Sequence, residues 1–233
     1  MKITGGILAG VLFSMVGFTL GAHAGEAKPV PDSRPILQDL QRKMSGLRSI
    51  YLEFTQERRL KLFAEPLKSE GVMLIERPDQ IRWETTLPYQ SILIANHKAV
   101  AQFEFDDGKW KKLRVGFPQI KHVMDQMSMM HQGKLEALTA DYTISAATNG
   151  RTVITLVPKD QTVRQVLSSI EIHLLPDLSA TRQVLMNEPS GDLTRIIFGK
   201  EVRDVNFPQG TFDLEKPLDL DAIKSAVNAK HSQ

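Results

Sequence analysis

Residues 69–83, SEGVMLIERPDQIRW, carry the most regular strand pattern of the chain. They suit two strands joined at Pro78-Asp79-Gln80, because proline and aspartate favour turns. Successive side chains of a strand point to opposite faces, so every second residue shares a face. One face of the predicted hairpin then carries the apolar residues Met73, Ile75, Ile81 and Trp83. The stretch therefore predicts a β-hairpin with one largely apolar face, and the remaining chain extends or covers it.

The beginning of the chain has the features of a secretory signal. Lys2 is followed by an apolar run from Ile7 to Leu20 and by the small-x-small pattern Ala22-His23-Ala24. We expect residues 1–24 to be removed as a signal peptide, which leaves residues 25–233 as one exported domain. The chain has no cysteine, so it forms no disulfide and offers no thiol for acylation at the processed N-terminus.

The charge and hydropathy of the chain argue against a nucleic-acid partner and against a membrane-spanning helix after the signal. The 233 residues hold 29 Lys and Arg against 27 Asp and Glu, and the basic residues are scattered. A nucleic-acid partner would need a concentrated basic face, so none is expected. No stretch after the signal approaches the roughly 20 apolar residues that a membrane-spanning helix needs.

A helix is predicted directly before the first strand. Ser33 can cap it and Pro35 suits its first turn, while Gly46 is a suitable stop. Its apolar residues recur at helical spacing and form one stripe: Ile36, Leu37, Leu40, Met44 and Leu47. We expect this stripe to pack on a sheet; a free helix on a membrane surface is the alternative.

From Arg48 onward the period changes from helical to two. Ile50, Leu52 and Phe54 alternate with more polar neighbours, as in a half-buried strand. The pairs Asp107-Gly108 and Asn149-Gly150 are strong hairpin signals. Further strands are predicted at residues 90–95, 100–105, 142–146, 152–157, 168–174, 183–187, 193–198 and 200–205, and a short helix at 222–229. Because no crossover helices intervene, the pattern predicts one antiparallel sheet in a single domain.

Residues 120–135 interrupt the strand pattern and suggest a methionine-rich helix. Met124, Met127, Met129 and Met130 crowd this stretch. Flexible thioether side chains fill irregular cores, and they also line surfaces that accept cargo of variable shape. Both interpretations remain open at this point.

Motifs for catalysis or metal binding are absent. The sequence has no HExxH, no phosphate loop, no GxSxG and no paired cysteines. His97, His122, His131, His173 and His231 have no metal-site spacing. The acidic residues Asp213, Glu215, Asp219 and Asp221 lack the pattern of a calcium loop and are interpreted as a solvated tail. No catalytic residue, metal or cofactor is predicted.

Arg77 is the conspicuous polar residue, because alternation places it on the apolar face of Met73 and Ile75. An unpaired buried guanidinium would cost several kcal/mol. Either its head reaches water from the end of the strand, or it bonds to a covering segment and so fastens a lid.

Four blocks of the chain resemble the LolA family of periplasmic lipoprotein carriers. They are LRSIYLEFTQ from Leu47, EGVMLIERPDQIRW from Glu70, LPYQSILIANHK from Leu87 and DYTISAATNGRTVITLVPKD from Asp141. F-x-Q followed by G-x5-R-P-x4-W is the specific part of this resemblance. The chain departs from the family pattern at His97, where glycine is usual, in the few aromatic residues of 100–105, and in the methionine-rich stretch.

The resemblance implies a mainly β fold with helices (α+β): one strongly curved antiparallel sheet forming an incomplete barrel, covered by the N-terminal helix and a methionine-rich lid. The hollow would hold acyl chains. Arg77 is similar to a family arginine that bonds to the lid and releases it when cargo enters, and Trp83 would line the hollow. The implied ligand-binding residues are Phe54, Met73, Ile75, Arg77, Ile81, Trp83, Ile92, Met124 and Met127.

The leading hypothesis is a non-enzymatic periplasmic carrier for lipoprotein transport in outer-membrane biogenesis. It would act as a monomer, take lipoprotein or other acylated cargo from an ABC-type release complex in the inner membrane, and deliver it to an outer-membrane acceptor. One rival is a lipid-sensing periplasmic regulator on the same scaffold. The other is an enzyme acting on lipids, which the lack of a paired nucleophile and base disfavours.

Overall fold

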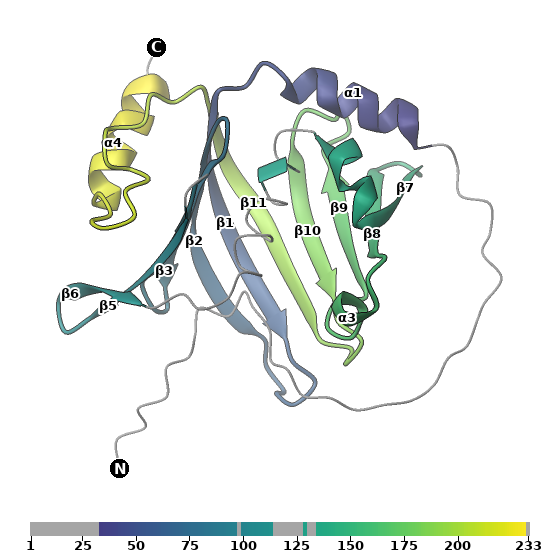
Figure 1. Cartoon of the computed structure of the whole chain (residues 1–233), viewed down its shortest axis with the longest axis horizontal. Coiled ribbons are helices and arrows are strands. Elements are labelled where there is room, and N and C mark those ends of the chain that lie inside the picture. The colour runs from purple at the N-terminus through teal and green to yellow at the C-terminus, as the bar shows by residue number, and fades with distance from the viewer. Residues whose placement is uncertain (1–32, 97–98, 114–127, 130–133, 232–233) are drawn as a thin grey trace.

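In the computed structural model, the described residues are 33–96, 99–113, 128, 129 and 134–231. Their strands form one antiparallel sheet with the order β6-β5-β4-β3-β2-β1-β11-β10-β9-β8-β7 (Figure 1). The strands are β1 (Ser49–Arg59), β2 (Leu67–Glu76), β3 (Gln80–Leu87), β4 (Ser91–Ala95), β5 (Val100–Asp106), β6 (Lys109–Leu113), β7 (Tyr142–Thr148), β8 (Thr152–Pro158), β9 (Ser169–Leu174), β10 (Thr181–Asn187) and β11 (Leu193–Arg203). The helices are α1 (Arg34–Met44), the 3-10 helix η1 (Leu135–Ala140), α3 (Gln161–Arg164) and α4 (Leu220–His231).

The single antiparallel sheet predicted from the sequence is confirmed. It is curved, with α1 across one end of its concave side and α4 on the convex side (Figure 1). The strand order has two ends, β6 and β7, so the described strands form an open sheet. Closure into an incomplete barrel stays a prediction.

The β2–β3 hairpin has the predicted faces, with Met73 opposite Trp83. Its turn begins one residue earlier than predicted, because Glu76 pairs with Gln80 and leaves Arg77 in the turn. Gly71 allows β3 to approach closely: a Cβ at this position would lie 2.0 Å from the Glu84 carbonyl oxygen. Glycine is therefore needed at this position of the sequence block, because any side chain would clash with the backbone of β3.

Two strands predicted at residues 193–198 and 200–205 form one strand, β11, and the prediction of a break was wrong. Leu52 pairs with Glu201 while Phe54 pairs with Phe198. Two residues of β11 therefore lie opposite Glu53, which is a β-bulge. The bulge shifts the alternation at Gly199, and from sequence this shift looks like the end of a strand. The strand β6, which no period-two pattern indicated, completes the hairpin at Asp107-Gly108.

Helix α1 packs its predicted apolar stripe against the concave face. Leu37, Leu40 and Met44 are buried, and Ile36 and Leu47 are partly buried against the same cluster. The predicted side-chain cap at Ser33 is wrong. Ser33 is itself nearly helical (φ −80°, ψ −10°), so its hydroxyl does not turn toward the first amides.

The segment after β11 covers the convex face, which corrects the interpretation of its acidic stretch as a solvated tail, while the helix predicted at 222–229 is confirmed as part of α4. Its chain packs on a second apolar cluster of the sheet through Phe212, Ile223 and Val227. The carboxylates of Asp213 and Asp219 are exposed, as predicted. They accept backbone amides of Lys216 and Asp221 respectively, which fixes turns of the segment.

A buried ion pair lies beneath this segment. Arg82 donates to the Glu84 carboxylate from Nε (2.9 Å) and Nη2 (2.6 Å). It also donates to the carbonyl oxygens of Thr211 (3.0 Å) and Leu218 (2.8 Å), and its side chain has no exposed surface. Burial raises the pKa of the Glu84 carboxyl, and the guanidinium of Arg82 opposes that rise. Arg82 thus joins the sheet to its convex cover.

The predicted signal peptide and most of the methionine-rich stretch lie outside the described residues. Of that stretch, Ser128 and Met129 are described and helical, and Lys134 and Leu135 are described where the 3-10 helix η1 begins. Within the described part of the chain, no helix is long and apolar enough to cross a membrane.

We predict that Arg82→Met lowers the free energy of unfolding by about 3–5 kcal/mol, because it leaves the Glu84 carboxylate buried without its partner. Adding Glu84→Leu should recover part of the loss. Urea unfolding followed by circular dichroism measures both. Arg42→Met is the control: Arg42 forms an exposed pair with Asp39, so its change should stay within about 0.5 kcal/mol. A double variant as unstable as Arg82→Met alone would contradict this account.

Candidate functional site

The concave face of the sheet carries one continuous apolar surface, and five residues predicted from the sequence lie in it. They are Phe54, Met73, Ile75, Ile81 and Trp83. The rings of Phe54 and Trp83 are tilted by 35° with centroids 4.2 Å apart. Each of the five is less than 5% exposed. The face assignment made from the β1, β2 and β3 sequences is therefore confirmed.

Ile92 lies on the opposite face, which corrects its place in the predicted set. It packs in the convex cluster with Leu74 and Phe103. Ile92 pairs with Glu84, whose side chain points to the convex side, so the register of β4 on β3 decides its orientation. Leu93 and Ala95 of β4 contact the concave cluster instead. Met124 and Met127, the two remaining predicted residues, lie outside the described residues.

The concave surface extends beyond the predicted residues across β11, β10, β9, β8 and β7. The additional buried residues on these strands are Tyr142, Ala146, Ile154, Leu156, Ile170, Ile172, Leu174, Val184, Ile196 and Phe198. Their alternation was visible in the sequence. The missing information was which of their two faces turns toward α1, and only the pairing of β11 with β1 supplies it.

Two short elements cover part of this surface. Leu37, Leu40 and Met44 of α1 and Leu138 of η1 belong to the same buried cluster as the sheet residues. Residues 45–48 form the short connection between helix α1 and strand β1. The cover is therefore a separate piece of chain whose position depends on contacts made at its ends and on its apolar stripe.

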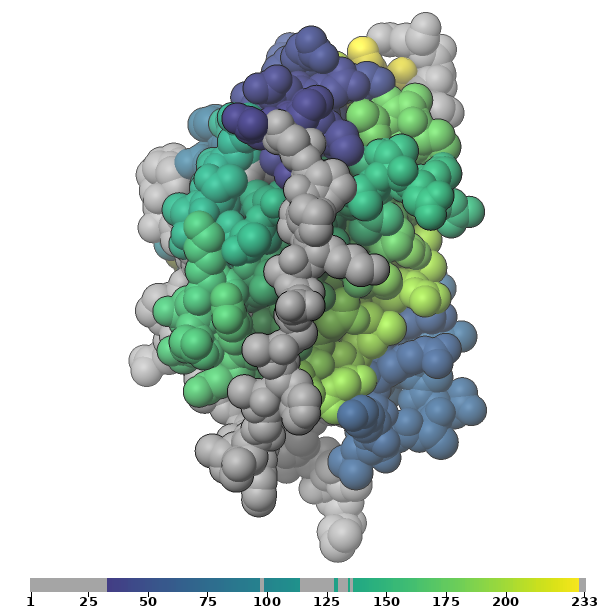
Figure 2. All heavy atoms as spheres, turned by 90° about the vertical axis from the view of Figure 1, so that its right-hand side faces the viewer, coloured from purple at the N-terminus to yellow at the C-terminus, as the bar shows by residue number. Residues whose placement is uncertain are grey.

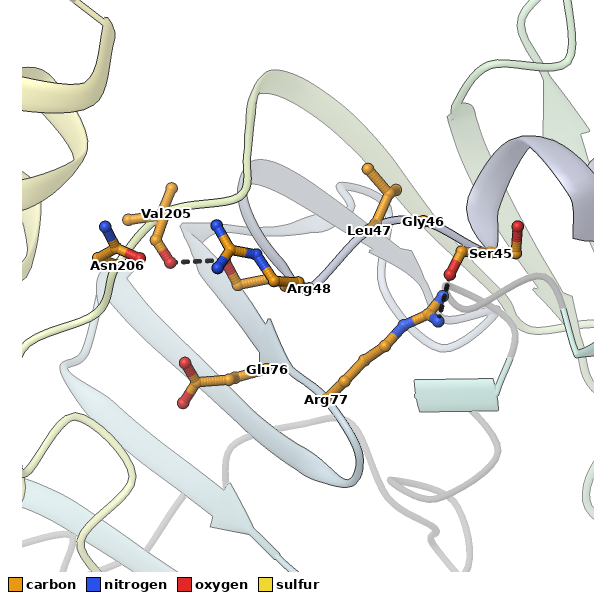
Figure 3. Close-up of a pocket in the computed structure, with 9 residues that line it drawn as sticks. Ser45, Gly46, Leu47, Arg48, Glu76, Arg77, Val205 and Asn206 are labelled. Atoms are coloured by element: carbon orange, nitrogen blue, oxygen red, sulfur yellow. Dashed lines mark hydrogen bonds between the residues drawn. The ribbon is translucent and has the colours of Figure 1, made fainter.

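Arg77 bonds to the end of α1 nearest the sheet (Figure 3). Its Nη1 donates to the Ser45 carbonyl oxygen (2.8 Å) and its Nη2 to the Met44 carbonyl oxygen (2.6 Å). These carbonyls belong to the C-terminus of the helix, where orphan acceptors and the helix dipole favour a cation. The bonds involve main-chain oxygens, so they depend on Arg77 alone among the side chains.

A pocket of about 370 Å³ adjoins this contact. Residues 45–49, Glu76, Arg77, Val205 and Asn206 line it. Figure 3 shows Arg77 directed toward Ser45, away from the carboxylate of Glu76. Ser49 closes the other side by donating its hydroxyl to the Val205 carbonyl oxygen (2.6 Å). Burial raises the pKa of the Glu76 carboxyl. The lining of this pocket mixes charged and apolar residues, whereas the cluster beneath α1 is apolar.

The residues of the concave face would bind a ligand through apolar contacts. No group of three potential metal ligands occurs among the residues that the structure describes. The Nε2 of His173 lies 3.3 Å from the Glu171 carboxylate on β9. Burial raises the pKa of the Tyr51 hydroxyl, which keeps it neutral on the convex side. The arrangement can hold an apolar ligand if the cover moves.

The chain matches one family model and several known proteins. The family model described as outer membrane lipoprotein carrier protein LolA matches residues 45–215, so α1 and α4 lie outside the match. The chain is 24% identical to the outer-membrane lipoprotein carrier protein of Methylococcus capsulatus, covering 86% of this chain and 91% of that protein. It is 24% identical to that of Pseudomonas putida, covering 94% and 96%. A LolA superfamily protein structure from Nitrosomonas europaea aligns with a TM-score of 0.44 at 10% identity, covering 77% and 95%.

We predict that Arg77→Leu leaves the sheet folded but increases amide hydrogen exchange in α1 by about 10-fold or more, because it removes two hydrogen bonds from a charged donor. Exchange measured by mass spectrometry on peptides covering residues 34–47 checks this. Arg48→Leu is the matched control: Arg48 lines the same pocket, and its side chain is 76% exposed. Equal exchange of α1 in the wild type and in Arg77→Leu would show that Arg77 does not hold the helix.

Proposed function

The chain belongs to the LolA family of outer-membrane lipoprotein carrier proteins, and from this membership we propose that it binds the acyl chains of lipoproteins, or of a related lipidated cargo, on its concave face. Carriers of this family are periplasmic, non-enzymatic transport proteins. The protein would take its cargo at the inner membrane and release it at the outer membrane. This proposal also requires the export that residues 1–24 predict.

The free energy of hydrating an acyl chain explains why such a carrier needs a covered surface. Each buried methylene contributes about 0.8 kcal/mol, so a chain of about twelve costs roughly 10 kcal/mol to hold in water. At about 25 cal/mol per Å², this requires an apolar cover of some 400 Å². A patch of that size left open would make the empty protein associate with other proteins. The carrier therefore has to close its surface when no cargo is bound.

The observation that supports the proposal most is the tethered cover. An apolar face runs from β4 to β7, and α1 packs on it while Arg77 bonds to the end of that helix. An entering acyl chain could take over the contacts of Leu37, Leu40 and Met44 if α1 moves. Phe54, Met73 and Trp83 would then form the wall that the cargo touches.

In this proposal Arg77 sets the balance between the empty and the loaded protein. Its bonds to Met44 and Ser45 stabilise the covered form alone, so cargo binding has to work against them. Removing the bonds destabilises the empty form and should make the protein retain cargo more tightly. A loss of about 1.4 kcal/mol would change the affinity about tenfold.

Partners follow from the transport route. The cargo is a lipoprotein or another acylated molecule, received from an ABC-type release complex in the inner membrane and passed to an acceptor at the outer membrane. The protein would act as a monomer, because its two apolar faces are covered within one chain.

A transfer assay tests the proposal. The protein is recovered from the periplasm of cells that express it, analysed by native mass spectrometry for bound acylated molecules, and incubated with outer-membrane vesicles. The wild type should carry such a molecule and lose it to the vesicles. Arg77→Leu should retain it, with transfer about 10-fold slower. The matched variant Arg48→Leu should transfer like the wild type.

Two results would contradict the proposal. One is the absence of any lipoprotein, lipid or other acylated compound from the recovered protein. The other is a stable complex with a regulatory protein without net transfer between membranes, which would favour a lipid-sensing function for the same scaffold. Unchanged transfer by Arg77→Leu would remove the role of Arg77 and leave cargo binding intact.

A further inference from the structure

The large apolar side chains that are exposed among the described residues lie at or beside the turns at one end of the strands. They are Leu62, Phe63, Leu67, Leu87, Tyr89 and Phe105. Three flank or occupy the loop between β1 and β2, and the others lie at or beside the turns after β3 and β5. In an antiparallel sheet these turns share one end, because β1, β3 and β5 run in the same direction. Single exposed apolar residues are common on protein surfaces, but several large ones at the turns of one sheet end are not.

That end lies opposite α1. Helix α1 leads into the first residues of β1, while the β1–β2 loop follows its last residue, Arg59. A strand of this length separates the two by about 35 Å. In Figure 1 the loop is at the lower end of the sheet and α1 is at the upper end. Figure 2 shows the blue spheres of the β1–β2 end at lower right, away from the purple spheres of α1 at the top.

The tip of the β1–β2 loop is held in place while its apolar side chains point to water. Leu62 is 88% exposed and Phe63 is 54% exposed. The Phe63 amide donates to the Leu60 carbonyl oxygen (3.0 Å), which closes a turn. The Lys61 amide donates to the Asp192 carboxylate (2.9 Å) from the loop before β11. The two apolar side chains are thus presented by a braced turn.

Basic residues flank these two side chains in the sequence. Residues 59–68 contain Arg59, Lys61 and Lys68 against a single acid, Glu65. All four are exposed, and Lys68 has an ion pair with Glu57 at 3.8 Å. Apolar side chains beside lysine and arginine match a membrane interface, where the apolar groups enter the acyl boundary and the cations face anionic headgroups. Protein interfaces, in contrast, are depleted in lysine.

We infer that the β1–β2 loop is a membrane-docking element, which inserts Leu62 and Phe63 into the surface of a bilayer containing anionic lipid. Docking places the end of the sheet against the lipid and leaves α1 and Arg77 at the far end. The contact needs no cargo, so it is independent of the proposed carrier function. Lipid vesicles without lipoprotein therefore test it separately.

The experiment is flotation of the exported protein with two kinds of vesicle: phosphatidylcholine alone, and phosphatidylcholine partly replaced by phosphatidylglycerol. The wild type should float with the anionic vesicles, and added salt should weaken this binding. Leu62→Ser together with Phe63→Ser should lose about 10-fold or more in binding, because two buried apolar side chains are removed. The exchange Leu62→Phe with Phe63→Leu keeps both apolar groups and should bind like the wild type.

Charge reversal gives a second, matched comparison. Arg59→Glu with Lys61→Glu should weaken binding to the anionic vesicles about 10-fold or more. Lys224→Glu with Lys230→Glu makes the same change of net charge on the exposed side of α4 and should leave binding unchanged. Thermal unfolding by circular dichroism establishes that each variant is folded.

Three outcomes would overturn the inference. The wild type could fail to float with anionic vesicles. The serine variant could bind as strongly as the wild type, or both charge-reversal pairs could weaken binding equally. A loop that ignores vesicles but is needed for binding to a purified membrane-protein partner would belong to a protein interface instead.

Discussion

The constraint on which the structure depends is that its central strands are apolar on both faces. In β2, Met73 and Ile75 turn to the concave side while Val72 and Leu74 turn to the convex side, and all four are buried. An antiparallel sheet usually leaves one face to water, which this sheet cannot do. Each face therefore needs a cover from elsewhere in the chain. The N-terminal helix α1 meets part of this need on the concave side, and the segment after β11 meets it on the convex side.

Two arginines of the same hairpin hold the two covers, in different ways. Arg82 is fully buried, pairs with Glu84 and bonds to carbonyl oxygens of the convex cover. Separating that cover would leave a buried charge without a partner, which is strongly unfavourable. Arg77 is only partly buried and bonds to two carbonyl oxygens of α1, for which water can substitute. In the proposed function, the convex cover therefore stays in place while the concave cover is the one that moves, and the cost of moving it lies in the Arg77 bonds and in exposing the apolar stripe of α1.

Alternation in the sequence predicted most of this arrangement. It assigned the faces of β1, β2 and β3 correctly, and helical spacing predicted the buried stripe of α1. It misassigned Ile92, because the face of β4 depends on its register with β3 and not on its own pattern. It divided β11 in two, because a bulge opposite Glu53 shifts the period. It took the acidic stretch from Asp213 to Asp221 for a solvated tail, because a segment held by Arg82 and a few apolar anchors has no regular period. The acceptors of Arg77 are main-chain atoms, which leave no signal in a sequence.

An acyl chain bound on the concave face would lie beside Trp83, so the fluorescence of this residue reports such binding. The chain has two tryptophans, so Trp110→Phe leaves Trp83 as the only one. Trp83 packs on Phe54 in the concave cluster, whereas Trp110 makes an edge-to-face contact with Phe105 of the β5–β6 hairpin. Titration of the Trp110→Phe variant with a triacylated lipopeptide should shift the emission of Trp83 as the peptide binds. An unchanged emission while mass spectrometry detects the bound lipopeptide would contradict the account.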